Sequence, residues 1–192
     1  VDILPAFAGP GKEQITIEHL LTHRSGLPAG RQLWKTARTP AEARAQVLET
    51  KLQNRPGAVF VYSDLGADVL GMVVEKISGM SLAQFSETRI FRPLGMFDTG
   101  FLPADSIRYR IAPTEVSPPR GYPVWGEVHD ESAFAMGGVA GHAGLFGTAA
   151  DLSIFAQMML NGGEYNGARI VSDSTIALFT RHVKNDRALG WE

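Results

Sequence analysis

Residues 55–79 read RPGAVFVYSDLGADVLGMVVEKISG, and the other segments of the chain are best understood in relation to them. A short apolar run at 58–61 predicts an extended or strand-like segment. The residues that follow carry apolar side chains at the spacing of an amphipathic helix: Leu65, Val69, Met72, Val73 and Ile77. Either Ser63 or Asp64 is suited to cap the start of this helix, and Ser78-Gly79 is suited to end it.

Tyr62 stands where the chain turns into the N-terminus of this predicted helix. The free N–H groups and the positive end of the helix dipole stabilise negative charge at such a position. A tyrosine held there is therefore a candidate proton acceptor. The placement by itself names no partner for Tyr62, and such a partner has to come from elsewhere in the protein.

The composition is that of an ordinary globular protein, with 192 residues, 44% hydrophobic and 20% charged. The 18 basic and 20 acidic residues are well mixed, so neither nucleic acid nor an anionic membrane is an implied partner. The absence of cysteine excludes disulfides, thiolate metal sites and cysteine nucleophiles. No apolar run approaches 20 residues, so no membrane span is expected.

Capping signals predict five further helices, and little else suggests regular structure. Their ranges, each after its cap, are 17–23 (Thr16), 40–53 (Thr39), 82–92 (Ser81), 149–160 (Thr148) and 173–181 (Ser172). Glu42 stands where it would complete a capping box with Thr39, and Pro93 is expected to stop the third of these helices. A tight hairpin turn is expected at Asn166-Gly167. The fold class is thus mainly α with minor β.

Residues 93–147 show no convincing periodicity and contain six prolines, so we expect an irregular loop region there. Its end is rich in glycine, and His142 and Gly144 lie within that part. Because glycine lets the backbone approach another group closely, we interpret His142 and Gly144 as candidate substrate-binding residues at the rim of a cleft. The alternative for His142 is a turn histidine with no chemical role.

No metal site or cofactor is expected. His19 and His23 have the spacing of two metal ligands on a helix, but Leu20 stands where the zinc-protease pattern requires glutamate. A capping or surface role is the favoured interpretation of both. His129-Asp130-Glu131 resembles a ligand cluster, although a solvated loop is the favoured interpretation.

The sequence contains no obvious nucleophile. No Gly-x-Ser-x-Gly occurs, and no serine is followed three places later by lysine. Ser86 comes nearest, but the residue three places on is Arg89, which cannot act as a base.

Four motifs taken together resemble the class C beta-lactamase family, which also contains penicillin-binding DD-peptidases and serine esterases. They are ITIEHLLTHRSGLP (15–28), PGAVFVYSDLG (56–66), FRPLGM (91–96) and GLFGTAADL (144–152), and they occur in the family's order along the whole chain. The resemblance implies the helical domain of an α/β fold, with Tyr62 as the motif tyrosine. It also implies an extracytoplasmic location.

The same resemblance implies parts that residues 1–192 do not show. The family's nucleophile is the serine of a Ser-x-x-Lys motif, and a Lys-Thr-Gly or His-x-Gly strand lines the far wall of its active site. Residues 189–192 resemble the strand before that wall. We therefore expect a single helical domain or fragment over 1–192 that is inactive alone, and that self-associates through the face meant for the sheet domain.

Asp64 departs from the family pattern, which more commonly has asparagine there. A carboxylate accepts hydrogen bonds but cannot donate one as an amide does, so Asp64 is expected either to pair with the motif lysine or to cap the helix. We expect a whole protein that acts on an amide, beta-lactam or ester through an acyl-enzyme, with Tyr62 and Asp64 as catalytic residues. The alternative is a non-catalytic module that binds cell-wall peptide or a protein.

Overall fold

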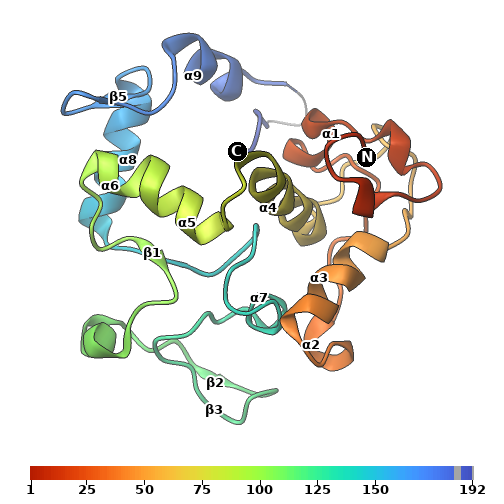
Figure 1. The fold of residues 1–192 in the computed structure, drawn as a ribbon, viewed down its shortest axis with the longest axis horizontal. Coiled ribbons are helices and arrows are strands. Elements are labelled where there is room, and N and C mark those ends of the chain that lie inside the picture. The colour runs from red at the N-terminus through yellow and green to blue at the C-terminus, as the bar shows by residue number, and fades with distance from the viewer. Residues whose placement is uncertain (184–186, 192) are drawn as a thin grey trace.

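The computed structural model describes residues 1–183 and 187–191, and this part of the chain is mostly helical (Figure 1). The helices are α1 (Ile17–Leu21), α2 (Leu33–Thr36), α3 (Pro40–Glu49), α4 (Asp64–Ser78), α5 (Leu82–Ser86), α6 (Arg92–Leu94), α7 (Glu131–Ala135), α8 (Ala149–Leu160) and α9 (Asp173–Thr180). Three short antiparallel ladders join β1 (Gly100–Phe101) to β4 (Leu145–Phe146), β2 (Val116–Ser117) to β3 (Tyr122–Pro123), and β5 (Glu164–Tyr165) to β6 (Ala168–Arg169). The predicted fold class, mainly α with minor β, is confirmed.

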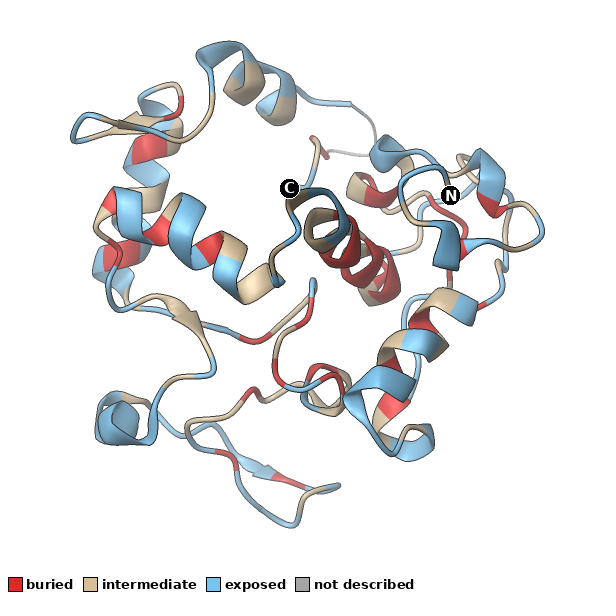
Figure 2. Ribbon diagram, viewed as in Figure 1, coloured by how far each residue is buried: buried red, intermediate tan, exposed pale blue. Residues whose placement is uncertain are grey.

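Helix α4 lies at the centre of the molecule and is its most buried element (Figures 1 and 2). Ser63 is its N-cap, and the Ser63 hydroxyl accepts a hydrogen bond from the N–H of Gly66 at 3.2 Å. Gly79 ends it in a left-handed conformation, with φ at 69°, which glycine adopts without steric cost. The prediction for this helix is confirmed, and of the two candidate caps the structure selects Ser63.

The main core forms where α1, α3 and α7 pack around α4. Its buried members include Leu20 from α1, Val47 from α3 and Ala133 from α7, which surround the α4 residues Leu65, Val69 and Met72. The helical spacing of the apolar residues in 55–79 therefore places one face of α4 in the core.

A second, smaller core joins α6 to α8. Its buried residues are Phe91, Leu94, Met96 and Met158. Asp151 holds α8 to the segment before β1, because its carboxylate accepts hydrogen bonds from the N–H of Asp98 at 2.9 Å and the hydroxyl of Thr99 at 2.8 Å.

Helix α3 is shorter than predicted. It ends at Glu49 rather than near 53, because the N–H groups of Gln53 and Asn54 donate to the carbonyl of Gly26, at 2.8 and 3.2 Å, instead of to their own helix. Helix α1 likewise ends at Leu21, since His23 adopts a left-handed backbone with φ at 52°.

Pro93 does not stop its helix, contrary to the prediction. A π-helical turn at Glu87–Phe91 leads into α6, and Pro93 lies at the start of that element. The helical conformation is continuous from Glu87 through Arg92, so Pro93 lies near the C-terminal end of this segment, and only Leu94 follows it before the helix stops. The helix ends instead at Gly95, which has a φ of 78°.

Two predicted extended segments form no strand. Residues 58–61 form no strand, since Ala58 closes a turn with Arg55, although the N–H of Val61 donates to the carbonyl of His23 at 2.9 Å. Residues 189–191 bend at Gly190, and Glu192 lies outside the described residues. The hairpin at Asn166-Gly167 and the bounds of α8 are as predicted. No helix in the described ranges is both long and apolar enough to cross a membrane.

Candidate functional site

Tyr62 lies at the surface, directly before the capped start of α4, with 58% of its area exposed. Its ring stacks on the imidazole of His23, with 4.4 Å between the ring centroids and 27° between the planes. The guanidinium carbon of Arg187 lies 5.8 Å from the Tyr62 ring centroid, so a positive charge adjoins the tyrosine.

His23 fixes the segment that carries Tyr62. Its Nδ1 accepts a hydrogen bond from the N–H of Ser63 at 3.0 Å, while its carbonyl accepts one from the N–H of Val61. The Ser63 hydroxyl also donates to the carbonyl of Pro28 at 2.7 Å. Sequence reasoning missed this role, which spans about 40 residues, although His23 lies within one of the motifs that carried the resemblance.

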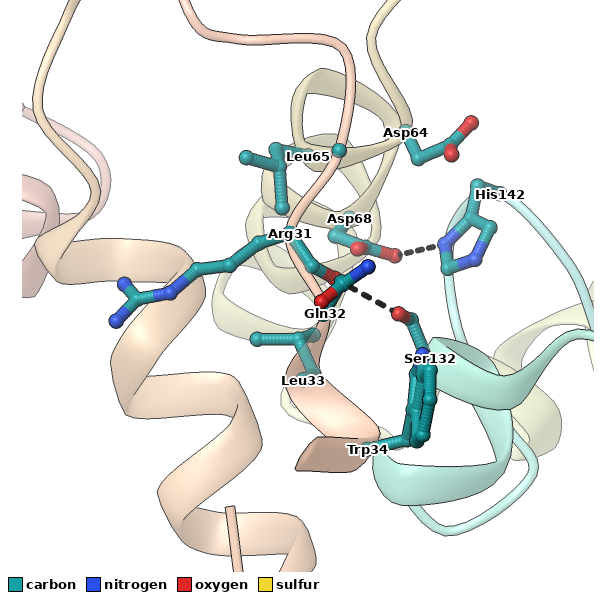
Figure 3. Close-up of a pocket in the computed structure, with 10 residues that line it drawn as sticks. Arg31, Gln32, Leu33, Trp34, Asp64, Leu65, Asp68, Ser132 and His142 are labelled. Atoms are coloured by element: carbon teal, nitrogen blue, oxygen red, sulfur yellow. Dashed lines mark hydrogen bonds and ion pairs between the residues drawn. The ribbon is translucent and has the colours of Figure 1, made fainter. Parts of the chain in front are cut away.

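A pocket of about 290 Å³ opens beside α4 (Figure 3). Its lining residues are Gly30, Arg31, Gln32, Leu33, Trp34, Asp64, Leu65, Asp68, Ser132 and His142. The structure thus brings the predicted residues Asp64 and His142 together. Tyr62 and Gly144 do not line this pocket, although Tyr62 precedes Asp64 by only two residues.

His142 is held between two carboxylates. Its Nδ1 lies 2.7 Å from Oδ1 of Asp68, and its Nε2 lies 3.0 Å from Oδ1 of Asp130. Burial alone lowers the pKa of His142, but the hydrogen bonds and charges of Asp130 and Asp68 outweigh that effect and raise the pKa to about 10. His142 is therefore an imidazolium at neutral pH, with both ring N–H groups donated.

This geometry excludes a Ser-His-Asp triad built from Ser132 and His142, because neither imidazole nitrogen is left to accept a proton. The Ser132 hydroxyl is itself committed, since it donates to the carbonyl of Arg31 at 2.9 Å (Figure 3). His142 is thus a fixed cation in the wall of the pocket.

The solvated-loop interpretation is wrong for Asp130. Its Oδ1 accepts the N–H of Ala133 at 2.7 Å and so caps α7, while the same carboxylate pairs with His142. The hydrogen bond from His142 lowers the pKa of Asp130, against the opposing effect of burial. The position of Asp130 directly before a helix is a local signal for its capping role. Its ion pair with His142 forms only through tertiary packing.

Asp64 is half-buried in the first turn of α4 and faces the pocket (Figure 3). Burial raises the pKa of Asp64, and the negative charges of Asp130 and Asp68 add to that effect, while the charge of His142 opposes it. The side chain that caps α4 is that of Ser63, so of the two expectations for Asp64 the capping one is wrong.

Gly144 lies directly before β4 and does not line this pocket. Its φ of 114° belongs to glycine, and a Cβ there would come within 2.3 Å of the carbonyl oxygen of Gly138. The structure gives Gly144 a conformational role, and its predicted contact with substrate stays a prediction.

His19 acts as a cap, as the favoured interpretation held. Its Nδ1 accepts the N–H of Thr16, while its own N–H donates to the Thr16 hydroxyl. No group of three His, Cys, Asp or Glu side chains placed to hold a metal ion occurs among residues 1–183 and 187–191.

A mostly helical unit with a tyrosine at the start of a capped central helix is the arrangement that the sequence motifs led us to expect. The chain belongs to the beta-lactamase family, because the family model described as "Beta-lactamase" matches residues 1–188. The predicted family relationship is therefore confirmed.

Individual relatives agree with this assignment. A putative D-alanyl-D-alanine carboxypeptidase of Salmonella enteritidis is 36% identical over 204 residues, which cover 94% of this chain and 47% of that protein. The chain thus spans about half the length of the curated relatives it matches.

Solved structures show the same fold. A penicillin-binding protein from Bacillus halodurans superposes with a TM-score of 0.72 at 20% identity, covering 98% of this chain and 59% of that one. A class C beta-lactamase mutant superposes with a TM-score of 0.70 at 19% identity, covering 93% of this chain and 46% of that one. Residues 1–192 therefore have the fold of the helical part of such proteins.

Proposed function

We propose that the whole protein is a serine hydrolase that acts through an acyl-enzyme on an amide, beta-lactam or ester bond, and that this chain supplies its catalytic tyrosine. Membership of the beta-lactamase family and the carboxypeptidase name of the Salmonella relative support this proposal. The observation that carries it is the setting of Tyr62, which is exposed, stacked on His23 and fixed at the start of the central helix.

In the proposed reaction Tyr62 moves the proton. As the serine oxygen attacks the carbonyl carbon of the substrate, the Tyr62 oxygen, in its phenolate form, takes the proton of the serine hydroxyl. The bond to the leaving amine or alcohol then breaks, and Tyr62 returns that proton to it. Water hydrolyses the acyl-enzyme in a second cycle of the same kind. Asp64 is proposed to pair with the lysine of the Ser-x-x-Lys motif.

Residues 1–192 contain no Ser-x-x-Lys spacing, so this chain alone is proposed to be inactive. The test treats both the chain and the whole protein with a penicillin or a fluorophosphonate and measures intact mass. We expect a stoichiometric adduct on the whole protein and none on the chain.

Within the whole protein, Tyr62→Phe is expected to slow acylation by about 10²–10⁴-fold, the usual contribution of a positioned acid–base group. Tyr109→Phe is the matched control, because Tyr109 is also an exposed tyrosine, at 78%, but is remote from α4 in sequence. A Tyr62→Phe protein that is acylated at the normal rate would contradict the role of Tyr62. A whole protein that binds cell-wall peptide but gives no adduct would favour the binding module instead.

A further inference from the structure

Asp68, in the second turn of α4, is a buried carboxylate, and one of its two oxygens has no hydrogen-bond donor among the described residues. Its Oδ1 accepts hydrogen bonds from His142 and from the N–H of Gly141 at 3.1 Å. Its Oδ2 accepts none from any described residue, although the side chain is only 1% exposed. A buried acceptor without a donor is costly, and Asp68 lines the pocket, so an N–H group that reaches this buried oxygen would satisfy it.

The charges around the pocket favour a cation. Three carboxylates, those of Asp64, Asp68 and Asp130, lie near the single imidazolium of His142. The Lys35 ammonium lies over the Trp34 ring, but Lys35 does not line the pocket. Arg31 also lines the pocket, but its guanidinium turns away (Figure 3) and donates to the carbonyl of Gln46 at 2.9 Å. Negative charge is therefore in excess where the free Asp68 oxygen lies.

The remaining walls suit an organic cation. The half-buried indole of Trp34 supplies apolar surface, and the buried side chains of Leu33 and Leu65 complete the lining. Indole rings attract cations, and Lys35 already places its ammonium 4.5 Å from the centroid of the Trp34 ring. Gly30 leaves space beside Asp64, since a Cβ there would lie 3.6 Å from its Oδ2.

We propose that this pocket binds the primary ammonium group of a small organic molecule, with Asp68 Oδ2 and the Asp64 carboxylate accepting its N–H groups and Trp34 covering its carbon chain. Pairing of Asp64 with a lysine in the whole protein would not by itself supply a donor to Asp68 Oδ2. The pocket would be the subsite for a substrate that carries an amino group, and this part of the proposal rests on the proposed function. Asp64 connects the pocket to the reaction, because it lies two residues from Tyr62 in the chain.

The test titrates the 192-residue chain with n-propylammonium chloride and, separately, with n-propanol at the same ionic strength. Amide ¹H–¹⁵N spectra report binding at Asp68 and Gly141. We expect saturable shifts with propylammonium and none with propanol. Asp68→Asn removes one charge-assisted hydrogen bond and is expected to weaken binding about tenfold or more. Asp64→Asn should also weaken it, whereas the exposed Asp105→Asn should not.

Equal shifts with the two probes, or unchanged propylammonium affinity in both the Asp68 and Asp64 variants, would overturn the proposal. If circular dichroism shows that Asp68→Asn fails to fold, Asp64→Asn decides the outcome. Tyr62→Phe should leave propylammonium affinity unchanged. A whole protein that is not acylated, together with a chain that binds propylammonium, would contradict the proposed function alone. A whole protein that is acylated, together with a chain that does not bind propylammonium, would contradict the pocket proposal alone.

Discussion

At the scale of single residues, His142 explains why three distant segments meet. It joins Asp68 of α4 to Asp130 at the start of α7, and it does so from the glycine-rich segment before β4. With 7% of its side chain exposed, His142 is shielded from water, so its two ion pairs are little screened by salt. His142, which the sequence predicted at the rim of a cleft, therefore also links the segments that form the wall of the pocket.

The raised pKa of His142 predicts a stability that falls in alkali. The ordinary histidine pKa is 6.5 and the folded value is about 10, so the stabilisation is fully present below pH 6.5 and is lost as the pH rises toward 10. Urea unfolding at pH 6, 8 and 10 should show this decline. Asp130, with its lowered pKa, is ionised throughout that range and adds no slope.

His142→Gln should flatten the alkaline decline and lower the free energy of unfolding at pH 6 by about 3–5 kcal/mol, because it leaves a buried carboxylate unpaired. His129→Gln is the control, since His129 is 41% exposed and its loss should cost less than about 1 kcal/mol. An alkaline decline of the same steepness in both variants would rule out His142 as its source.

At the scale of elements, the glycine-rich segment packs directly on the backbone of α4. A Cβ on Gly71 of α4 would lie 3.3 Å from the Cα of Gly141, and a Cβ on Gly141 would lie 1.9 Å from the carbonyl oxygen of Ala67. This close approach lets the Gly141 N–H reach Asp68 and places His142 beside it. The glycines are thus required by packing between two elements.

Gly141→Ala is therefore expected to destabilise the chain by about 3 kcal/mol or more, because the neighbouring atom is helix backbone that cannot move aside. Thermal unfolding followed by circular dichroism measures the loss. Gly100→Ala serves as the matched control, since a Cβ there meets nothing within 4 Å and should change stability by less than about 0.5 kcal/mol. Equal melting temperatures for the two variants would show that the segment is not packed this way.

At the scale of the whole molecule, several large apolar side chains are exposed. On α8, Leu152 is 66% and Leu160 is 81% exposed. The same helix contributes Met158 to the second core, with Phe155 and Met159 packed against it. Exposed apolar surface promotes association between molecules. On this ground we propose that the chain self-associates.

The 192-residue chain is expected to show an apparent mass that rises with concentration in sedimentation or light-scattering measurements. Replacing Leu152 and Leu160 together by lysine should shift the chain toward monomer, because two charges would have to be buried in any contact through α8. Glu13→Lys, an exposed change outside α8, should leave the mass unchanged. A chain that is monomeric at every concentration would contradict this proposal.

Local chemistry accounts for what the sequence predicted well. The caps at Ser63, Thr148 and Ser172, the bounds of α8 and the hairpin turn at Asn166-Gly167 all depend on neighbours within a few residues. The motifs that identified the family are likewise contiguous. Tyr62 and Asp64 could be named because they lie within one of them.

The tertiary structure alone decided which side chains meet. His142 lies 74 residues from Asp68 and 12 from Asp130, and His23 lies 40 residues from the serine whose N–H it accepts. Periodicity and capping rules carry no information about pairs so distant in the chain, because such pairs form only when helices pack. The sequence therefore determined the helices, the motif tyrosine and the family, while packing around α4 created the charged pocket.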